Sequence, residues 1–320
     1  MARLVRNTLI TAKIETTAGT DASPTGSANA ILVKDFTPPE YVANNIARNL
    51  VRGYFGASEE LVGTAYAKCG FKVELAGSGT AGTAPAWGPL WQACAGTEST
   101  LLTPSRVEYG LLSTAQKTLT IYWYDDGVLH KLTGSIGNAK LSAKVGGIFE
   151  ADFEFMGVYN VITATANATG TFTSWKTPPA LTKANVVDVT LGGSYAAGVI
   201  TGGTGYATTG ITLDLGNKNS FTPTLSTESM DTTDRETTGT VEFDITAAQE
   251  VSFMSNVVSN TTQSLSMVIG TVAGNKNMLY APSVQFVNPK KTELNGRRTI
   301  SYDMRMVPGS GNDEFKIICL

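Results

Sequence analysis

An internal repeat is the feature that most constrains the fold of this chain. The segment Phe-Glu-Ala-Asp-Phe-Glu-Phe at residues 149–155 closes the first half, and Ile-Ser-Tyr-Asp-Met-Arg-Met at residues 300–306 closes the second. In both segments apolar residues alternate with polar ones, as in a half-buried strand, and an aspartate takes the same place. Two similar units in one chain indicate a pseudo-symmetric assembly subunit before they indicate an enzyme.

The elements before these closing strands also recur in the same order. In each half an alternating segment, at residues 71–75 and 241–245, precedes a short predicted helix. The helix in the first half has apolar residues at i, i+3, i+4 and i+7, and the helix in the second half begins with a capping box at Thr246. The predicted buried faces are Trp87, Leu90, Trp91 and Cys94 in the first helix and Ala247, Val251, Met254 and Val258 in the second. Further strands follow, with Asp126-Gly127 as a hairpin turn in the first half.

Composition favours β-structure in two domains of ordinary size. The chain has 320 residues, of which 42% are hydrophobic and only 16% are charged, whereas long helices usually carry many charged residues. We therefore predict a mainly β protein with two tandem domains, each a β-sandwich or barrel-forming sheet with one short flanking α-helix. The predicted division is an N-terminal arm at residues 1–30, a first domain at 31–175 and a second domain at 176–320. Residues 41–61 are expected to form a long loop or hairpin.

Charge and cysteine usage exclude several functional classes. A net charge of −3 and a pI near 5.4 argue against strong general affinity for nucleic acid. Cys69, Cys94 and Cys319 have no CxxC spacing and indicate reduced thiols in a cytosolic setting. We expect neither a signal peptide nor a membrane span.

Catalytic and cofactor motifs are weak. The stretch from Gly77 to Gly82 fits G-x-G-x-x-G, but a dinucleotide site needs a parallel βαβ unit, so we interpret it as a surface loop. His130 is the only histidine and is interpreted as structural, which leaves no catalytic arrangement and no metal site of His and Cys ligands. We predict a protein that is not an enzyme and binds no cofactor.

The order of elements, together with the opening sequence at residues 7–21 followed by Ile31-Leu-Val, resembles the tail tube proteins of long-tailed bacteriophages. The resemblance implies two tail-tube-like domains whose sheets join between subunits into a barrel, so that rings form. It implies that rings stack through an arm and a long hairpin loop into a tube that conducts DNA. A duplicated tube domain implies a trimeric, pseudo-hexameric ring. Four strands from each of six domains would give a barrel roughly 45–50 Å across the backbone.

The same resemblance implies partners and a location. The partners would be other copies of the chain, tape measure, tail terminator and distal tail proteins, and genomic DNA in transit without specific binding, with no membrane. The protein would reside in the virion tail and assemble in the cytoplasm of the host bacterium.

Two sets of charged residues are candidate functional residues. Acidic residues on the polar faces of the repeat strands would line the lumen and repel phosphates, although they also fit the solvated face of a sandwich. These are Glu74, Glu150, Asp152, Glu154, Glu242, Asp244 and Asp303. Basic residues near predicted turns favour contacts between rings over a solvated turn or DNA contact. These are Arg48, Arg52, Lys290, Lys291, Arg297 and Arg298.

Two other functions stay open on the sequence alone. A capsid or baseplate decoration protein could be built on similar sandwiches, but it would add to a preformed shell instead of polymerising. A carbohydrate-binding module would need aromatic side chains on one face. Tyr122, Trp123 and Tyr124 are consecutive and cannot share a face of one strand.

Overall fold

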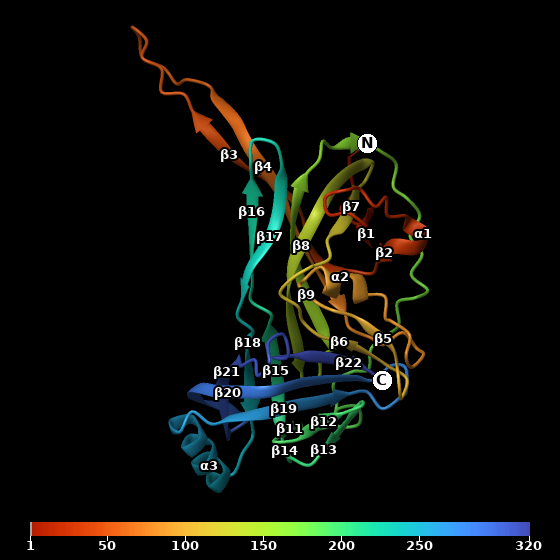
Figure 1. The fold of residues 1–320 in the computed structure, drawn as a ribbon, viewed down its shortest axis with the longest axis vertical. Helices are drawn as coiled ribbons and strands as arrows, with labels where there is room; N and C mark the ends of the chain where they lie inside the picture. Colours follow the sequence, from red (N-terminus) through yellow and green to blue (C-terminus); the bar gives the residue numbers. More distant parts are fainter. Residues whose placement is uncertain (1) are drawn as a thin grey trace.

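The structure, a computed structural model, describes residues 2–320, and strands dominate it. The helices are short: α1 (Gly26–Asn29), α2 (Gly88–Gln92) and α3 (Ala247–Val258). The strands pair in antiparallel fashion throughout (Figure 1). The predicted mainly β fold is therefore confirmed.

One antiparallel sheet of eight strands runs through both halves of the molecule, and each half contributes four neighbouring strands. In spatial order the first half contributes β3 (Lys34–Ala47), β4 (Glu60–Glu74), β9 (Glu150–Tyr159) and β8 (Val128–Lys144). The second half continues with β15 (Thr208–Asp214), β18 (Thr238–Phe243), β21 (Arg297–Met306) and β20 (Asn277–Leu294). The strand order of the first half is thus repeated in the second.

Register supports the equivalence of the two halves. Asp152 of β9 lies between Lys72 of β4 and Lys140 of β8, and Asp303 of β21 lies between the corresponding residues of β18 and β20. Apolar side chains alternate along these strands, so that one face of the sheet is buried and the other is polar. We refer to residues 8–164 as the first unit and to residues 189–319 as the second unit.

An outer layer covers the apolar face of the sheet in each unit. The first unit contributes β1 (Thr8–Ile14), β2 (Ala30–Ile31), β7 (Leu119–Asp125) and β10 (Thr163–Ala164). The second unit contributes β11 (Val189–Leu191), β14 (Thr204–Tyr206), β19 (Thr262–Ile269) and β22 (Lys316–Cys319). The remaining strands form three hairpins: β5 (Ser99–Leu102) with β6 (Arg106–Tyr109), β12 (Ser194–Ala196) with β13 (Val199–Thr201), and β16 (Asn217–Pro223) with β17 (Glu228–Arg235).

The segment expected to be a free N-terminal arm is partly built into the first unit. β1 pairs with β7 along its whole length, from Thr8 opposite Asp125 to Ile14 opposite Leu119. Leu9, Ile10 and Ala12 of β1 are buried. The expectation of an arm outside the domain is therefore wrong for residues 8–14, because their alternating apolar side chains complete the core.

Glu15 links the loop after β1 to the outer layer by hydrogen bonds. These bonds lead to a testable prediction. The buried carboxylate of Glu15 accepts hydrogen bonds from the Thr118 and Thr120 hydroxyls at 2.6 and 2.7 Å and from the Gly19 and Gly134 N–H groups at 2.7 and 2.9 Å. A Glu15→Gln variant replaces one acceptor oxygen by a donor and leaves buried donors unpaired. It is expected to lose about 2–3 kcal/mol of unfolding free energy in urea. The exposed Glu60→Gln change is the control, and equal stability of both variants would contradict the assignment.

The predicted hairpins are present, with one difference in the first of them. Residues 41–61 belong to the long β3–β4 hairpin, and Asp126-Gly127 turns β7 into β8 with both residues at positive φ. Pro38 and Pro39 lack the backbone N–H that a ladder needs and would be expected to end a strand, but β3 continues through them with a shift in register. This is possible because β3 is an edge strand, where a missing N–H and a bulge are tolerated.

The predicted buried face is confirmed for the first helix and is wrong for the second. Trp87, Leu90, Trp91 and Cys94 are all buried, as predicted for the first helix. The capping box at Thr246 is confirmed, but the predicted buried face of α3 is wrong, because Val251 and Val258 are 71% and 79% exposed. Phe253 is buried instead, since its ring packs among Tyr206, Phe243, Phe286 and Tyr302.

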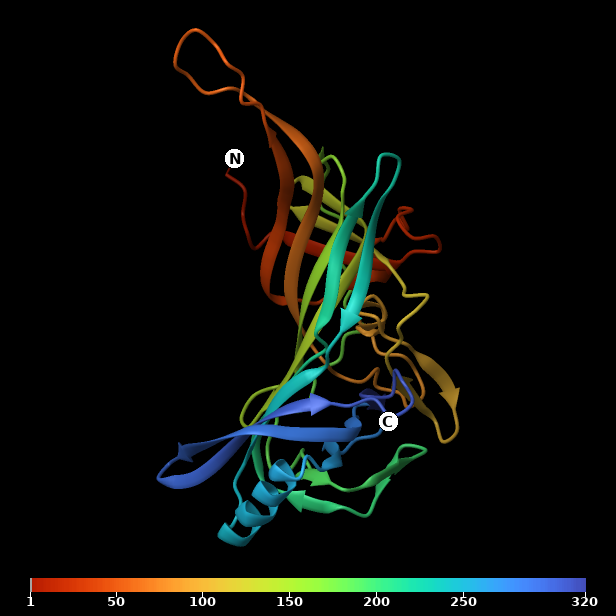
Figure 2. The ribbon, with the colours of Figure 1, turned by 60° about the vertical axis from the view of Figure 1, so that its left-hand side comes forward.

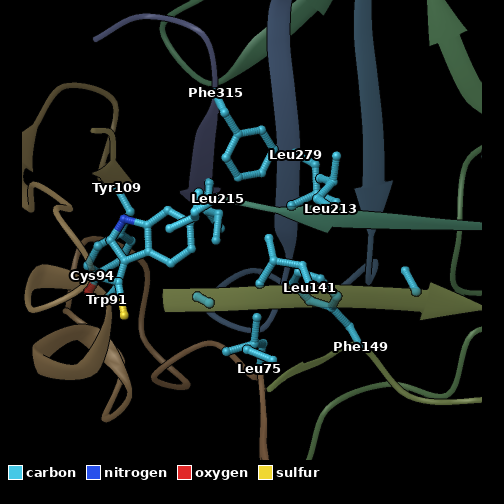
Figure 3. Packing of buried hydrophobic residues seen from close by; sticks show 14 of the residues in the cluster. Leu75, Trp91, Cys94, Tyr109, Leu141, Phe149, Leu213, Leu215, Leu279 and Phe315 are labelled. Carbon is cyan, nitrogen blue, oxygen red and sulfur yellow. The ribbon is translucent and has the colours of Figure 1, made fainter. Parts of the chain in front are cut away.

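The two units share one continuous hydrophobic core. The ring centroid of Trp91 of α2 lies 6.2 Å from that of Phe315 in the second unit. Figure 3 shows Leu215 next to the Trp91 ring, with Leu279 to the right of Phe315. The chain from residue 165 to 188 links the units, so the predicted domain boundary near residue 175 lies in this connection.

Candidate assembly surfaces

The internal junction between the units is made by adjacent sheet strands. β8 pairs with β15 from Lys140 opposite Asp214 to Lys144 opposite Gly210. Beyond the strands, the Leu215 N–H donates to the Ala139 carbonyl at 3.1 Å, and the Asn217 side-chain amide donates to the carbonyls of Cys94 and Gly137 at 2.8 and 3.0 Å. In spatial order, the last strand of the first unit, β8, therefore pairs directly with the first strand of the second unit, β15.

A second strand junction reinforces this contact on the outer side. β6 of the first unit pairs with β22 of the second, with Tyr109 opposite Ile317. β6 belongs to an insertion between α2 and β7, whereas in the second unit α3 is followed almost directly by β19. In the part of the chain that the structure describes, only the first unit has such an insertion between its helix and the next strand of the outer layer.

The G-x-G-x-x-G stretch forms part of the same junction. The Gly77 N–H donates to the Asn275 side-chain oxygen at 2.9 Å, and the Gly79 N–H donates to the Gly274 carbonyl at 2.8 Å. A Cβ on Gly77 would lie 2.1 Å from the Gly274 oxygen, so only glycine allows this close approach. The motif thus binds the β19–β20 turn of the second unit.

Both ends of the eight-stranded sheet are open in the isolated chain. Among residues 2–320, no strand pairs with the second edge of β3, and β20 from Phe286 to Leu294 pairs only with β21. These edges occupy the places in the repeat that β15 and β8 occupy at the internal junction. Unpaired edges of this length are templates for pairing with another chain.

Most of the predicted acidic residues lie on the polar face of the sheet, where Glu150, Asp152 and Asp303 line a groove of about 750 Å³. Glu74 lies on β4, Glu150, Asp152 and Glu154 lie on β9, Glu242 lies on β18 and Asp303 lies on β21. Asp244 follows β18 and forms an ion pair with Arg297. The structure thus brings six of the seven carboxylates onto one face of adjoining strands.

Basic residues lie between these carboxylates. Lys34 pairs with Glu150, and Lys140 lies 3.4 Å from Glu154 and 4.0 Å from Asp214. Lys72, Lys144 and Arg305 line the same groove. The face therefore carries both signs of charge, and the sequence analysis missed the contribution of β8 because its lysines lie outside the repeated closing strands.

Two of the carboxylates have shifted pKa values for different reasons. Burial raises the pKa of Asp152, and the neighbouring Glu154 adds to the effect while Lys72 opposes it. Hydrogen bonds lower the pKa of Glu242, because the hydroxyls of Thr209, Thr292 and Thr299 each donate to its carboxylate at 2.6 Å. Glu242 thereby stabilises the β20–β21 hairpin close to its turn.

The predicted basic residues fall on two hairpins that the structure does not bring together. Arg48 and Arg52 lie at the β3–β4 hairpin, where both pair with Glu59. The other four belong to the β20–β21 hairpin, with Lys290 near Asp303, Lys291 near Glu250, Arg297 near Asp244, and Arg298 exposed. Figure 2 shows the two hairpin tips well separated along the molecule.

The tip of the β3–β4 hairpin also carries apolar side chains that the sequence analysis did not select. Val51, Tyr54 and Phe55 are exposed there, with no core beside them. The signal was available, because the pairs Leu50-Val51 and Tyr54-Phe55 interrupt an otherwise polar hairpin. Exposed apolar clusters of this kind mark interaction sites.

The structure offers little that suggests catalysis or metal binding. Burial lowers the pKa of His130 on β8, and the nearby Asp125 opposes this shift. The three cysteines are buried thiols that form no disulfide. Across residues 2–320, no group of three or more His, Cys, Asp or Glu side chains is placed to hold a metal ion. No helix in that range has both the length and the apolar character needed to cross a membrane.

Comparison with known proteins places the chain in a family. No curated protein matches the sequence significantly. The family model described as phage tail tube protein matches residues 6–307, which is nearly the whole chain. The repeated sheet with open edges is therefore found in a chain that belongs to the phage tail tube protein family, a structural component of the virion tail.

Proposed function

We propose that three copies of this chain close into a pseudo-sixfold ring and that the rings stack into a tube. The single observation that carries this proposal is the β8–β15 junction, in which one unit already extends the sheet of the other. The open edge of β20 is the counterpart of β8, and the open edge of β3 is the counterpart of β15. Pairing these two edges between copies would repeat the internal junction around a closed ring and remove every unpaired edge.

The dimensions of such a ring suit passage of DNA. Three copies with eight strands each give a barrel of about 24 strands, and spacing of ~4.8 Å with a tilt of ~40° gives a diameter of roughly 45–50 Å. The polar face of the sheet would line the bore, because the core and the outer layer cover the other face. Interleaved carboxylates and lysines would give phosphates no continuous basic surface to bind, which suits a conduit.

Ring stacking is assigned to the β3–β4 hairpin tip and to the basic β20–β21 hairpin. These hairpins extend beyond the packed body of the chain (Figures 1 and 2). Tape measure, tail terminator and distal tail proteins would meet the ends and interior of the tube. Assembly would take place in the host cytoplasm.

Negative-stain electron microscopy of the purified protein, with rotational averaging, tests the proposal. Threefold rings with a sixfold outline, or tubes built from them, are the expected result. Analytical ultracentrifugation measures the copy number in parallel. Monomers at all concentrations would contradict the proposal and favour a decoration protein, and rings of six chains would contradict the trimer.

The hairpin tip gives a separate prediction about stacking. Changing Val51, Tyr54 and Phe55 together to serine is expected to leave ring formation intact and to shorten or abolish tubes. The reason is that these exposed apolar side chains have no partner within the chain and would be buried only between rings. Tube length measured on micrographs checks it. A control variant carries serine at the exposed Val199 of the β12–β13 hairpin, and tubes of normal length in the triple variant would overturn the assignment.

A further inference from the structure

Helix α3 presents an apolar face to solvent. Val251 and Val258 are seven residues apart and lie on this face together with the exposed Ala247, while Phe253 points into the core on the opposite side. The helix lies at the lower end of the molecule in Figure 1, at the far side of the second unit. An apolar face on a helix of a structural protein indicates a contact that the isolated chain leaves unmade.

The corresponding helix of the first unit shows what such a face can do. α2 lies between the two units, and its residue Trp91 is fully buried against Phe315 and Leu215 of the second unit (Figure 3). The Asn217 side chain also donates to the Cys94 carbonyl just after α2. The helix of one unit thus packs on the next unit as part of the internal junction.

The surface that receives α2 has a counterpart in the first unit. Asp214 pairs with Thr238, which faces Arg305 of β21. Thr37 of β3 pairs with Gly70, which faces Glu154 at the matching position of β9, so Thr37 is the counterpart of Asp214. Leu215, the residue after Asp214, therefore corresponds to Pro38. Leu279 of β20 corresponds to Leu132 of β8, because each lies five residues before a residue, Val284 or Gly137, that faces Met306 of β21 or Phe155 of β9 at matching positions. Phe315 and Ile162 each lie between a closing strand and the short strand, β22 or β10, that pairs with the start of β20 or β8.

The counterparts Leu132 and Ile162 line an open groove in the first unit, together with Pro39, which lies beside the counterpart of Leu215. Its volume is about 150 Å³, and its walls include Pro39, Tyr41, His130, Leu132, Tyr159 and Ile162. Tyr41 and Ile162 are 47% and 46% exposed, and Val161 beside them is also exposed. Burial lowers the pKa of His130, which keeps its ring neutral and compatible with an apolar cover.

We propose that the apolar face of α3 packs into this groove on the next copy in the ring, with Val251 and Val258 against Tyr41 and Ile162. The inference rests on the proposed ring and names a contact beyond the pairing of sheet edges. Helix α3 and β7, which pairs with the His130 end of β8, lie toward opposite ends of the long axis in Figure 1, so α3 cannot reach the groove of its own chain. The occupant is therefore a second copy of this chain.

The test uses the full chain with Val251→Asp and Val258→Asp together, and it measures the dissociation constant of the ring by analytical ultracentrifugation. Because both positions are exposed, the unfolding midpoint of the monomer is expected to stay unchanged. The ring dissociation constant is expected to rise about tenfold or more. The exposed Val199→Asp change is the control and should leave the ring intact.

The outcomes separate this inference from the ring itself. If the unchanged protein forms no rings, the proposed function fails. If it forms rings and the double aspartate variant forms them equally well, the ring stands and the α3 contact is overturned.

A crosslinking variant decides the matter should the aspartate variant misfold. Val251→Cys combined with Ile162→Cys is expected to give dimers and trimers on denaturing gels after mild oxidation, since the three native cysteines are buried. Either single change is the control. Rings that yield no covalent dimer from the double cysteine variant would also overturn the contact.

Discussion

Replacing Arg235 with alanine is expected to lower the free energy of unfolding by about 3–5 kcal/mol, because it leaves the carboxylate of Glu314 buried without its partner. Arg235 ends β17, and its guanidinium Nε and Nη2 lie 2.7 and 2.6 Å from the same Glu314 oxygen, with both side chains more than 90% buried. Its Nη1 donates to the Leu112 carbonyl of the first unit at 2.9 Å. The change therefore removes an ion pair and a tie between units.

Urea unfolding followed by circular dichroism measures this effect. The matched control is Arg305→Ala, which breaks an ion pair with Glu236 in which both side chains are about half exposed, and it is expected to cost about 0–1 kcal/mol. A variant that also replaces Glu314 with glutamine removes the unpaired charge and should recover part of the loss. Equal unfolding free energies of the Arg235→Ala and Arg305→Ala variants would show that the buried ion pair contributes no more to stability than the exposed one.

A Gly77→Ala substitution is expected to cost about 3 kcal/mol, at the upper end for overpacking, because backbone atoms surround the new methyl group. The Cβ would lie 2.1 Å from the Gly274 oxygen and 2.9 Å from two further backbone atoms of the β19–β20 turn. No side chain there can rotate away. Relief requires the turn to move off the first unit, which also breaks the hydrogen bonds of Gly77 and Gly79.

Thermal unfolding of Gly77→Ala and Gly53→Ala forms the matched comparison. Gly53 lies at the β3–β4 hairpin tip, and a Cβ there would meet nothing within 4 Å. The control should unfold like the unchanged protein, and Gly77→Ala should unfold at a clearly lower temperature. Normal stability of Gly77→Ala would mean that the glycine motif is a plain surface loop.

The sequence predicts the sheet strands well because their side chains alternate with period two. In β9 and β21 this alternation marks which residues meet the core, and the repeat supplies the strand order of the second half from the first. The first helix is predicted for a related reason, since Trp87, Leu90, Trp91 and Cys94 form one apolar face and no large apolar side chain lies on the opposite face. Local patterns thus identify elements whose burial is decided by their own periodicity.

Contacts between distant segments could not be predicted in the same way. In α3 two apolar faces compete, and the wider ring of Phe253 takes the core position because four aromatic rings from other strands surround it. The pairing of β6 with β22 joins residues 107–109 to residues 317–319, and no local pattern encodes that contact. The lysines that β8 contributes to the polar face could not be predicted for the same reason, since Lys140 meets Glu154 only through strand pairing.

The outer β6–β22 connection has a geometric consequence for any filament made from this chain. Because only the first unit carries that insertion, turning a three-chain ring by one unit does not superimpose it on itself. In the proposed tube, successive rings would then have three equivalent angular settings instead of six, and the twist from ring to ring would be selected from this smaller set.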